Sequence, residues 1–251
     1  MKPITGIVIT LNEAYNIGEC LISLSKVCDE LIVVDSGSDD KTAEISKAYG
    51  AKIYTQDYLG DGPQKAFGVP YAKNDWIISL DADERLSEDA VSIINTLKLD
   101  DIQIAYGFHR KNYVGEHWIK AAGFYPDSVV RLYNRTTSGY LNKKAHSSVK
   151  APSIYQTKTH IEHLTYRDLS DWIYRINALS TRDAWAMKER GKKPCVFNPI
   201  LHSTNAFIRK LIFKGGVFQG ADGFLVAITT AFHAYMKYAK LNELHKKTAT
   251  E

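Results

Sequence analysis

The sequence predicts an α/β protein with a doubly wound, mostly parallel sheet, followed by a helical C-terminal extension. In the first half of the chain, short β-rich apolar runs alternate with segments of helical periodicity, and three of these runs end in polar or acidic residues. Strand–helix alternation is typical of a parallel sheet with helices on both faces, and such sheets bind ligands at the carboxyl ends of their strands. The fold class therefore indicates where a binding site would lie.

The elements of the first half follow from local patterns. Runs rich in β-branched residues predict strands, and turn residues separate them from helices. Ser36–Asp40 is such a turn, and Asp39 is the expected N-cap of the helix that follows it. In chain order we expect a strand at Ile4–Thr10, a helix at Tyr15–Val27, a strand at Leu31–Val34, a helix starting near Lys41, a strand at Ala51–Thr55, a helix at Gln64–Ala72 and a strand from Trp76.

Helical patterns dominate after about residue 165. Asp168–Arg190 has the periodicity of a long helix, which Gly191 and Pro194 should end. The dipeptide Asn198-Pro199 predicts a further break in the chain. Two more helices are expected at Phe207–Phe213 and Ala221–Ala239.

The apolar run from Trp76 ends abruptly in Asp81-Ala82-Asp83-Glu84. Burying this much negative charge is unfavourable unless a cation compensates it. Asp81 and Asp83 are two residues apart, so on an extended chain they point the same way. Hard oxygen ligands at the end of a strand suit Mg²⁺ or Mn²⁺ held together with substrate phosphates. The alternative is an ordinary acidic turn.

Two further strand ends carry polar side chains. Asn12 and Glu13 follow the first strand, and Asp35 follows the second. These residues should converge with the D-x-D turn on one crevice. The sequence has neither G-x-G-x-x-G after its first strand nor a G-x-x-x-x-G-K-[ST] loop, so a glycine cradle for phosphate is not expected. A nucleoside diphosphate attached to a sugar, bound through a metal, fits such a crevice.

Several segments resemble those of inverting family 2 glycosyltransferases in order and spacing. The donor-side segments are ITLNE (Ile9–Glu13), VVDSGSDDKT (Val33–Thr42), Gln64-Lys65 and NDWIISLDADE (Asn74–Glu84). The closest resemblance is to the bacterial group that adds glucose to the heptose region of the lipopolysaccharide or lipooligosaccharide inner core. The acceptor-side and C-terminal segments that resemble this group are Gly123–Arg135, His163–Asn177 and Phe213–Lys240.

The resemblance implies a domain organisation and an activity. Residues 1–165 would form a GT-A type catalytic domain, with a donor half at 1–100 and an acceptor half at 101–165, and residues 166–251 a helical, membrane-associating extension. The implied activity is metal-dependent inverting transfer of a hexose, with Mg²⁺ or Mn²⁺ as the cofactor. The implied donor is a UDP-sugar, UDP-glucose first, and the implied acceptor is a lipid-anchored saccharide of the lipopolysaccharide core.

The same resemblance assigns roles to the crevice residues. Asp83 would contact the metal and Asp81 the ribose, while Glu84 would orient them. His163, in the segment His160–His163, aligns with the family's C-terminal metal histidine. The donor-binding positions implied in this way are Leu11, Asn12, Glu13, Asp35, Lys65, Asp81, Ala82 and Asp83.

Two of these positions are the expected contacts with the nucleotide. Lys65 would pair with the diphosphate or the base edge, although a solvent-exposed helix lysine is the alternative. Ala66 stands where the family usually has Asn. Asp35 can accept a hydrogen bond from a uracil N–H, which would favour a uridine donor.

The resemblance leaves the general base open. The group carries an H-E pair, and this sequence has His146 followed by Ser147, which cannot act as a base unaided at neutral pH. The catalytic candidates are Asp127 first, then Glu116 and His146. Arg131 either binds a donor or acceptor phosphate or forms a structural ion pair.

Composition narrows the possible partners and compartment. The formal net charge of +4 is compatible with an anionic membrane or a phosphate-rich substrate, and it is too weak and scattered for nucleic-acid binding. Cys20, Cys28 and Cys195 form no C-x-x-C motif, which favours reduced thiols in a cytosolic setting. A strand begins within a few residues of the N-terminus, so no signal peptide is expected.

The C-terminal region carries an apolar run, Gly223–Met236, with basic flanks. The run is shorter than the ~20 residues that span a bilayer, and this pattern is typical of a segment lying on an anionic leaflet. We therefore expect a cytoplasmic protein, peripheral on the inner face of the bacterial inner membrane. The alternatives are packing on the catalytic domain and a homodimer through the C-terminal helices.

Other functions stay open from the sequence. One is a glycosyltransferase for another cell-surface glycan, such as a teichoic acid or capsule precursor. Another is a nucleotide-sugar-binding protein that lacks transferase activity, which the Ser147 replacement favours. A pure scaffold would not need the paired Asp81 and Asp83 turn.

Overall fold

The structure of the protein is a computed structural model that describes residues 2–143 and 147–248. It divides into two compact units. The first unit comprises Met1–Lys111 and Asp127–His163, and the second comprises Asn112–Pro126 and Leu164–Glu251. The division after His163 lies close to the expected boundary at residue 165, but the insertion Asn112–Pro126, assigned above to the acceptor half, packs within the second unit.

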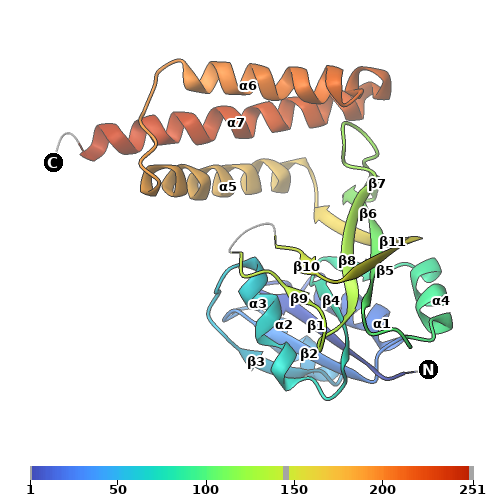
Figure 1. The fold of residues 1–251 in the computed structure, drawn as a ribbon. Helices are drawn as coiled ribbons and strands as arrows, with labels where there is room; N and C mark the ends of the chain where they lie inside the picture. Colours follow the sequence, from blue (N-terminus) through green and yellow to red (C-terminus); the bar gives the residue numbers. More distant parts are fainter. Residues whose placement is uncertain (1, 144–146, 249–251) are drawn as a thin grey trace. The chain divides into compact units, whose positions relative to one another are not determined.

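A mixed sheet organises the first unit (Figure 1). Its strands run in the order β3-β2-β1-β4-β8-β6-β11-β5. The first four strands are parallel, as predicted, whereas β8 pairs antiparallel with both β4 and β6, and β5 pairs antiparallel with β11. The bounds are β1 Ile4–Thr10, β2 Glu30–Asp35, β3 Lys52–Thr55, β4 Trp76–Asp81, β5 Glu84–Leu86, β6 Ile104–Val114, β8 Asp127–Asn134 and β11 Ser153–Tyr166.

Helices cover both faces of the parallel strands, which is the doubly wound arrangement expected from the sequence. Alternate residues of β1 enter different cores: Ile4 and Val8 join one apolar cluster, and Ile7 joins the other. Burial on both faces explains why these strands read as continuous apolar runs. The helices are α1 Ile17–Ser25, α2 Thr42–Ala48, α3 Asp61–Phe67 and α4 Glu88–Thr96, with a 3₁₀ turn at Val69–Tyr71.

Three short strands complete the described sheets. β9 (Gly139–Tyr140) and β10 (Val149–Lys150) pair antiparallel as a small separate sheet. β7 (His117–Trp118) pairs with the end of β6 inside the insertion that belongs to the second unit.

The second unit is built on three long helices that lie side by side (Figure 1). They are α5 Leu169–Glu189, α6 Asn198–Ile208 and α7 Gly220–Thr248, and a π-helical turn at Arg209–Phe213 and a 3₁₀ turn at Gly216–Gln219 join the last two. The core of this unit includes Trp172 of α5, Val226 of α7 and Ala122 of the insertion. The insertion therefore belongs to the helical core.

Three sequence predictions about helix boundaries are wrong. The helix expected at Phe207–Phe213 begins earlier, because α6 spans Asn198–Ile208 and residues Arg209–Phe213 form a π-helical turn after it. Asn198-Pro199 does not break the chain, because Pro199 occupies the first turn of α6, where its missing N–H leaves no hydrogen bond unmade. Asp39 does not cap α2: the N-cap residue is Lys41, and the Thr42 N–H donates to Asp40 Oδ1 at 2.8 Å. The carboxylate one residue nearer to the helix takes the capping role.

Within the described residues, no single helix combines the length and apolar character that a membrane span requires. Asn198–Phe213 and Gly216–Lys246 meet that requirement only as a pair, bent by 66° at the break between them.

Candidate functional site

The strand register gathers the polar strand ends at one edge of the sheet. β1 lies between β2 and β4, with Thr10 opposite Asp35 and Ile9 opposite both Val34 and Asp81. Because the strands are parallel, their carboxyl ends and the turns that follow them lie at the same edge. The convergence that the sequence predicted is therefore present.

The turns that follow β1 and β2 are tied together through Ser38. Its hydroxyl accepts from the Asn12 N–H at 2.8 Å and donates to Asp35 Oδ1 at 2.5 Å, while its N–H donates to Asp35 Oδ2 at 3.0 Å. Asn12 has a φ of 54°, a left-handed conformation that asparagine tolerates, and its side-chain oxygen accepts from the Asp39 N–H at 2.9 Å. The buried Asp35 carboxylate thus shapes the turn, and its contact with a pyrimidine stays a prediction.

The neighbouring predicted positions belong to the same pair of turns. The Glu13 N–H donates to Thr42 Oγ1 at 2.9 Å, and its carboxylate accepts from Asn16 Nδ2 at 2.7 Å. Leu11 is exposed at this edge of the sheet. Their part in donor binding stays a prediction.

Asp81 and Asp83 do not point the same way, contrary to the extended-chain expectation. Asp81 is the last residue of β4, Ala82 and Asp83 form a turn, and Glu84 begins β5. Asp81 contacts Lys65 and Asp83 contacts His163. The D-x-D sequence therefore serves two different environments.

Lys65 is buried in an acidic setting. Its ammonium group lies 3.0 Å from Asp81 Oδ1 and 2.8 Å from Asp61 Oδ1, and 5.5 Å from the centre of the Tyr140 ring. With 4% of its surface exposed, Lys65 is not the solvent-exposed lysine of the alternative interpretation. Asp61 was missed from the sequence, although its i,i+4 spacing to Lys65 on a helix was the available signal.

Gln64 explains why Lys65 reaches this position. Its amide donates to Ser36 Oγ and to the Gln56 carbonyl, both at 3.1 Å, and its oxygen accepts from the Leu59 N–H at 3.1 Å. These bonds fix α3 to the turn after β2. The next residue of the helix then projects toward the end of β4.

Arg131 is a structural ion pair rather than an available phosphate ligand. It donates to Asp81 Oδ2 at 3.0 Å, to Glu84 Oε1 and to the Tyr140 hydroxyl at 3.2 Å, and only 4% of it is exposed. The fully buried Glu84 also accepts from the Asp81 N–H at 3.1 Å and from Arg110 at 3.3 Å. Glu84 therefore orients the Asp81 backbone, while its expected effect on Asp83 stays a prediction.

The resulting charges alternate in sign along a connected cluster. We call it the charged cluster; its members are Asp61, Lys65, Asp81, Arg131, Glu84, Arg110 and Asp127. Burial alone would raise the pKa of Asp81, but the Arg131 and Lys65 charges outweigh it and hold this pKa well below its usual range. Burial and Arg131 act to lower the pKa of Lys65, but Asp81, Tyr140 and Asp61 keep it above its ordinary value. Both groups are therefore ionised at neutral pH.

Asp83 and His163 form a second pair beside this cluster. Antiparallel pairing of β11 with β5 sets His163 opposite Glu84, and its Nε2 lies 3.5 Å from Asp83 Oδ2. Burial tends to lower the pKa of His163, but the Asp83 carboxylate raises it above its ordinary value. His160, three residues earlier on the strand, instead contacts Asp89 at 2.9 Å.

The base candidates have different settings. Asp127 lies opposite Arg110 in the β6–β8 register and accepts from Arg110 Nη2 at 2.8 Å, with 30% of its side chain exposed. Glu116 is exposed and belongs to the second unit. His146 lies outside the described residues. Ser147 donates from its N–H to Asp61 Oδ2 at 2.7 Å and from its hydroxyl to the Leu141 carbonyl at 2.7 Å.

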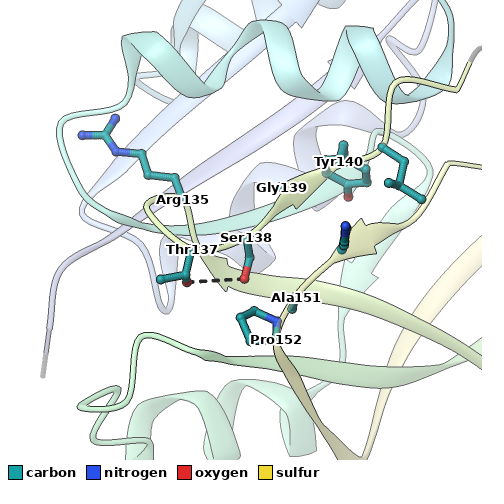
Figure 2. A pocket seen from close by; sticks show the side chains of 9 residues that line it. Arg135, Thr137, Ser138, Gly139, Tyr140, Ala151 and Pro152 are labelled. Carbon is teal, nitrogen blue, oxygen red and sulfur yellow. Dashed lines mark hydrogen bonds between the residues drawn. The ribbon is translucent and has the colours of Figure 1, made fainter.

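A cavity of about 560 Å³ is lined in part by Tyr140 (Figure 2). Its walls come from β9, β10 and the segments beside them, including Thr137, Ser138 and Pro152. Arg135 also lines it, but its guanidinium group donates hydrogen bonds to Asp75 and to the carbonyls of Val69 and Ala72. None of the predicted site residues lines this cavity, and the candidate site is the group of side chains at the strand ends.

The amino-acid sequence is similar to those of several known proteins along most of its length. A protein of Rickettsia bellii named "Uncharacterized glycosyltransferase" is 30% identical over 262 residues, which is 97% of this chain and 87% of that protein. "Lipopolysaccharide core biosynthesis glycosyltransferase LpsC" of Rhizobium meliloti is 28% identical over 258 residues, which is 97% of this chain and 93% of that protein. The crystal structure of S. aureus TarS aligns with a TM-score of 0.47 and 14% identity, covering 91% of this chain and 55% of that chain.

The match to a family model covers the strands and turns that form the crevice. Residues 5–164 match the family described as "Glycosyl transferase family 2". The predictions of a GT-A type α/β fold and of an enzyme are confirmed. The chain belongs to glycosyl transferase family 2 and is a glycosyltransferase.

Proposed function

We propose that the protein transfers a hexose, glucose first, from a UDP-sugar to a lipopolysaccharide or lipooligosaccharide core acceptor, with inversion and with a divalent metal. The observation that carries this proposal is the Asp83–His163 pair, 3.5 Å apart at the crevice, next to the buried Lys65. The pair offers oxygen and nitrogen donors where a nucleoside diphosphate would enter a sheet of this type.

The residues present fit Mg²⁺ or Mn²⁺ bound together with a donor. The described residues contain no group of three or more His, Cys, Asp or Glu that could hold a metal ion alone. Mg²⁺ usually binds through one or two carboxylates plus substrate phosphates, so the diphosphate oxygens would complete the shell around Asp83 and His163. The metal, when bound, supplies charge neutralisation for the departing diphosphate.

The chain's own residues account for the remaining steps. Asp81, held ionised by Lys65 and Arg131, presents acceptor oxygens to a ribose hydroxyl. Asp127, oriented by Arg110, takes the proton of the acceptor hydroxyl. The acceptor oxygen then bonds to the anomeric carbon as the bond to the diphosphate breaks on the opposite face, which inverts the configuration.

Two relatives support the acceptor and the sugar. The Rhizobium meliloti relative is named for lipopolysaccharide core biosynthesis and matches along 97% of this chain, which supports a core acceptor. A "Glucosyl-3-phosphoglycerate synthase" of Petrotoga mobilis is 37% identical over 84 residues, or 30% of this chain, which supports a glucosyl donor.

A screen of nucleotide sugars by thermal shift, with and without Mn²⁺, tests the proposal. UDP-glucose should raise the melting temperature only when the metal is present, because the proposed site binds the diphosphate through the metal. A ligand at about 100 times its dissociation constant adds about 2.7 kcal/mol of stability. Product formation with a lipopolysaccharide core acceptor should follow. Absence of any metal-dependent nucleotide-sugar binding would refute it.

The same screen separates the alternatives. Donor binding without transfer, and without slow hydrolysis of the donor, would identify a nucleotide-sugar-binding protein. Transfer to a teichoic acid or capsule precursor, and none to a core acceptor, would assign the enzyme to another cell-surface glycan.

A further inference from the structure

α6 exposes apolar side chains at both of its ends. One group lies at its start and the other runs from its last residue into the π-helical turn, with the exposed polar residues Thr204 and Asn205 between them. We call the two apolar groups together the α6 face. Its members are Phe197, Ile200, Leu201, Ile208, Ile212 and Phe213.

The opposite side of α6 packs against α7. The His202 ring stacks on Tyr238 with the centroids 4.1 Å apart and an interplanar angle of 5°, and Phe207 meets Phe224 edge to face at 5.7 Å. The core contacts of α6 are thus made by residues other than those of the α6 face. In the described part of the second unit, the α6 face is left exposed to solvent.

The turn between α6 and α7 extends the apolar surface at a fixed tip. Phe213 and Phe218 are 78% and 89% exposed there. Gly215 adopts a left-handed φ of 68°, and a Cβ on Gly223 would lie 1.9 Å from the Gly216 carbonyl oxygen. This close backbone approach, which only glycine allows, fixes the path of the backbone that carries the exposed aromatic residues.

Along the segment that contains α6 and the turn after it, the charged residues have a single sign. Residues 191–221 contain five Lys or Arg and no Asp or Glu. Three of the cations, Arg209, Lys210 and Lys214, belong to the tip, and Lys192 and Lys193 precede α6. An apolar helix face with basic residues at both ends is complementary to an anionic lipid surface.

We propose that the α6 face lies along the interface of a lipid leaflet with anionic headgroups. The two helical segments Asn198–Phe213 and Gly216–Lys246 are bent by 66° relative to each other, which fits a helix that lies on the leaflet better than a straight membrane span. The run expected to make this contact, Gly223–Met236, has two faces. Val226, Ala227 and Ala234 of α7 are buried inside the unit, whereas Phe224, Ile228 and Phe232 are exposed, so contact of this run with a membrane stays a prediction. This surface does not depend on transferase activity.

Vesicle flotation of the full-length protein tests the proposal. The protein should float with phosphatidylcholine vesicles that contain phosphatidylglycerol, and high salt should weaken the binding. Replacing both tip aromatics, Phe213→Ser with Phe218→Ser, should reduce binding by about tenfold or more per residue. Arg209→Gln with Lys214→Gln should reduce binding only to the anionic vesicles, by roughly fivefold per cation.

Tyr174→Ser is the matched control, because Tyr174 is an exposed aromatic residue of the same unit on α5. Its binding should equal that of the wild type. An equal loss in this variant, or unchanged binding in the Phe213/Phe218 variant, would overturn the assignment to α6. Unaltered circular dichroism and melting temperature would show that each variant folds.

The exposed Cys195, two residues before Phe197, reports on the other end of the face. An environment-sensitive fluorophore on this thiol should shift to the blue when anionic vesicles are added. Flotation without that shift would show that the helix does not lie flat, and would refute the proposal. So would concentration-dependent dimerisation, measured by sedimentation velocity, that the Phe213/Phe218 substitutions abolish while lipid binding persists.

Discussion

Asp81 and Asp83 lie two residues apart but contact different basic side chains. Asp81 is held by Arg131 and Lys65, both nearly buried, and its charge is already compensated within the protein. Asp83 has the imidazole of His163 at 3.5 Å, a donor that a metal ion can share. The local environment, rather than the D-x-D pattern, therefore favours Asp83 as the metal ligand.

The metal role proposed for Asp83 predicts the behaviour of Asp83→Ala. This variant should lose metal-dependent nucleotide binding and transfer, since His163 alone is a weak site, while its melting temperature stays close to that of the wild type. Binding by calorimetry with and without Mn²⁺ measures the effect. Asp89→Asn, which removes the negative charge beside the other histidine on β11, is the control and should bind normally. Near-normal turnover of Asp83→Ala in the presence of EDTA would exclude the metal mechanism.

The role of Asp127 as base predicts that Asp127→Asn lowers kcat by about 10²-fold or more and leaves donor affinity intact. Arg110 keeps Glu84 as a partner in this variant, so the fold should persist. Steady-state kinetics with donor and acceptor varied separately distinguish the two parameters. A wild-type rate would transfer the role to Glu116 or His146.

Among the elements, one buried carboxylate connects three neighbouring strands of the sheet. Glu30, at the start of β2, accepts from Thr5 on β1, from Lys52 on β3 and from the N–H of Lys73, each at 2.8 Å. Burial alone would raise the pKa of Glu30, but the hydrogen bonds from Lys52, Lys73 and Thr5 outweigh it and lower this pKa. The carboxylate thus stabilises the order β3-β2-β1 from the end opposite the crevice.

The pH dependence of Glu30→Gln follows from that lowered pKa. The carboxylate binds protons more weakly in the folded than in the unfolded chain, so its stabilisation is full above the unfolded pKa of about 4.3 and fades as the pH falls through the lower folded value. The variant should be less stable by about 1–3 kcal/mol at neutral pH, and the difference should shrink on acidification. Urea unfolding across this range measures it.

Glu88→Gln is the matched control for this experiment. Its side chain is 82% exposed and pairs with Lys26 at the surface, so the substitution should change stability by less than about 0.5 kcal/mol. A pH-independent loss in Glu30→Gln would show that the charge of Glu30 contributes nothing.

At the scale of the whole molecule, the two units are not consecutive in the sequence. The insertion Asn112–Pro126 leaves the first unit after β6 and returns at β8, yet Ile119 and Ala121 are almost fully buried with Trp172 in the helical core. Removing the helices alone would expose these apolar residues. The register of Arg110 opposite Asp127 shows that a short turn could close the gap.

This arrangement predicts two different truncations. A chain ended after His163 should aggregate, because the insertion loses its core. The same truncation with residues 112–126 replaced by a short Asn-Gly hairpin turn should stay soluble and retain metal-dependent nucleotide binding. Gel filtration and thermal shift measure both properties. Equal solubility of the two chains would contradict the assignment of the insertion to the second unit.

Features that depend only on neighbouring residues could be predicted from the sequence. The apolar runs of β1, β2 and β4, the turns that end them and the family motifs are local, so the parallel half of the sheet and the place of the crevice could be predicted. The helix Leu169–Glu189 was equally clear, because the apolar period and the Asp168 cap are local too.

The contacts between the charged side chains of the site depend on the packing of distant segments. Asp81 and Asp83 were expected to act together, but the chain turns between them, and Arg131 and His163 arrive from strands far along the sequence. The packing of the insertion in the second unit and the exposure of the α6 face could not be predicted from the sequence for the same reason. The interaction energy of two buried charges, or of two apolar faces, depends on the distance between the segments that carry them. The order of residues in the chain does not give this distance, which is set only when the strands and helices pack.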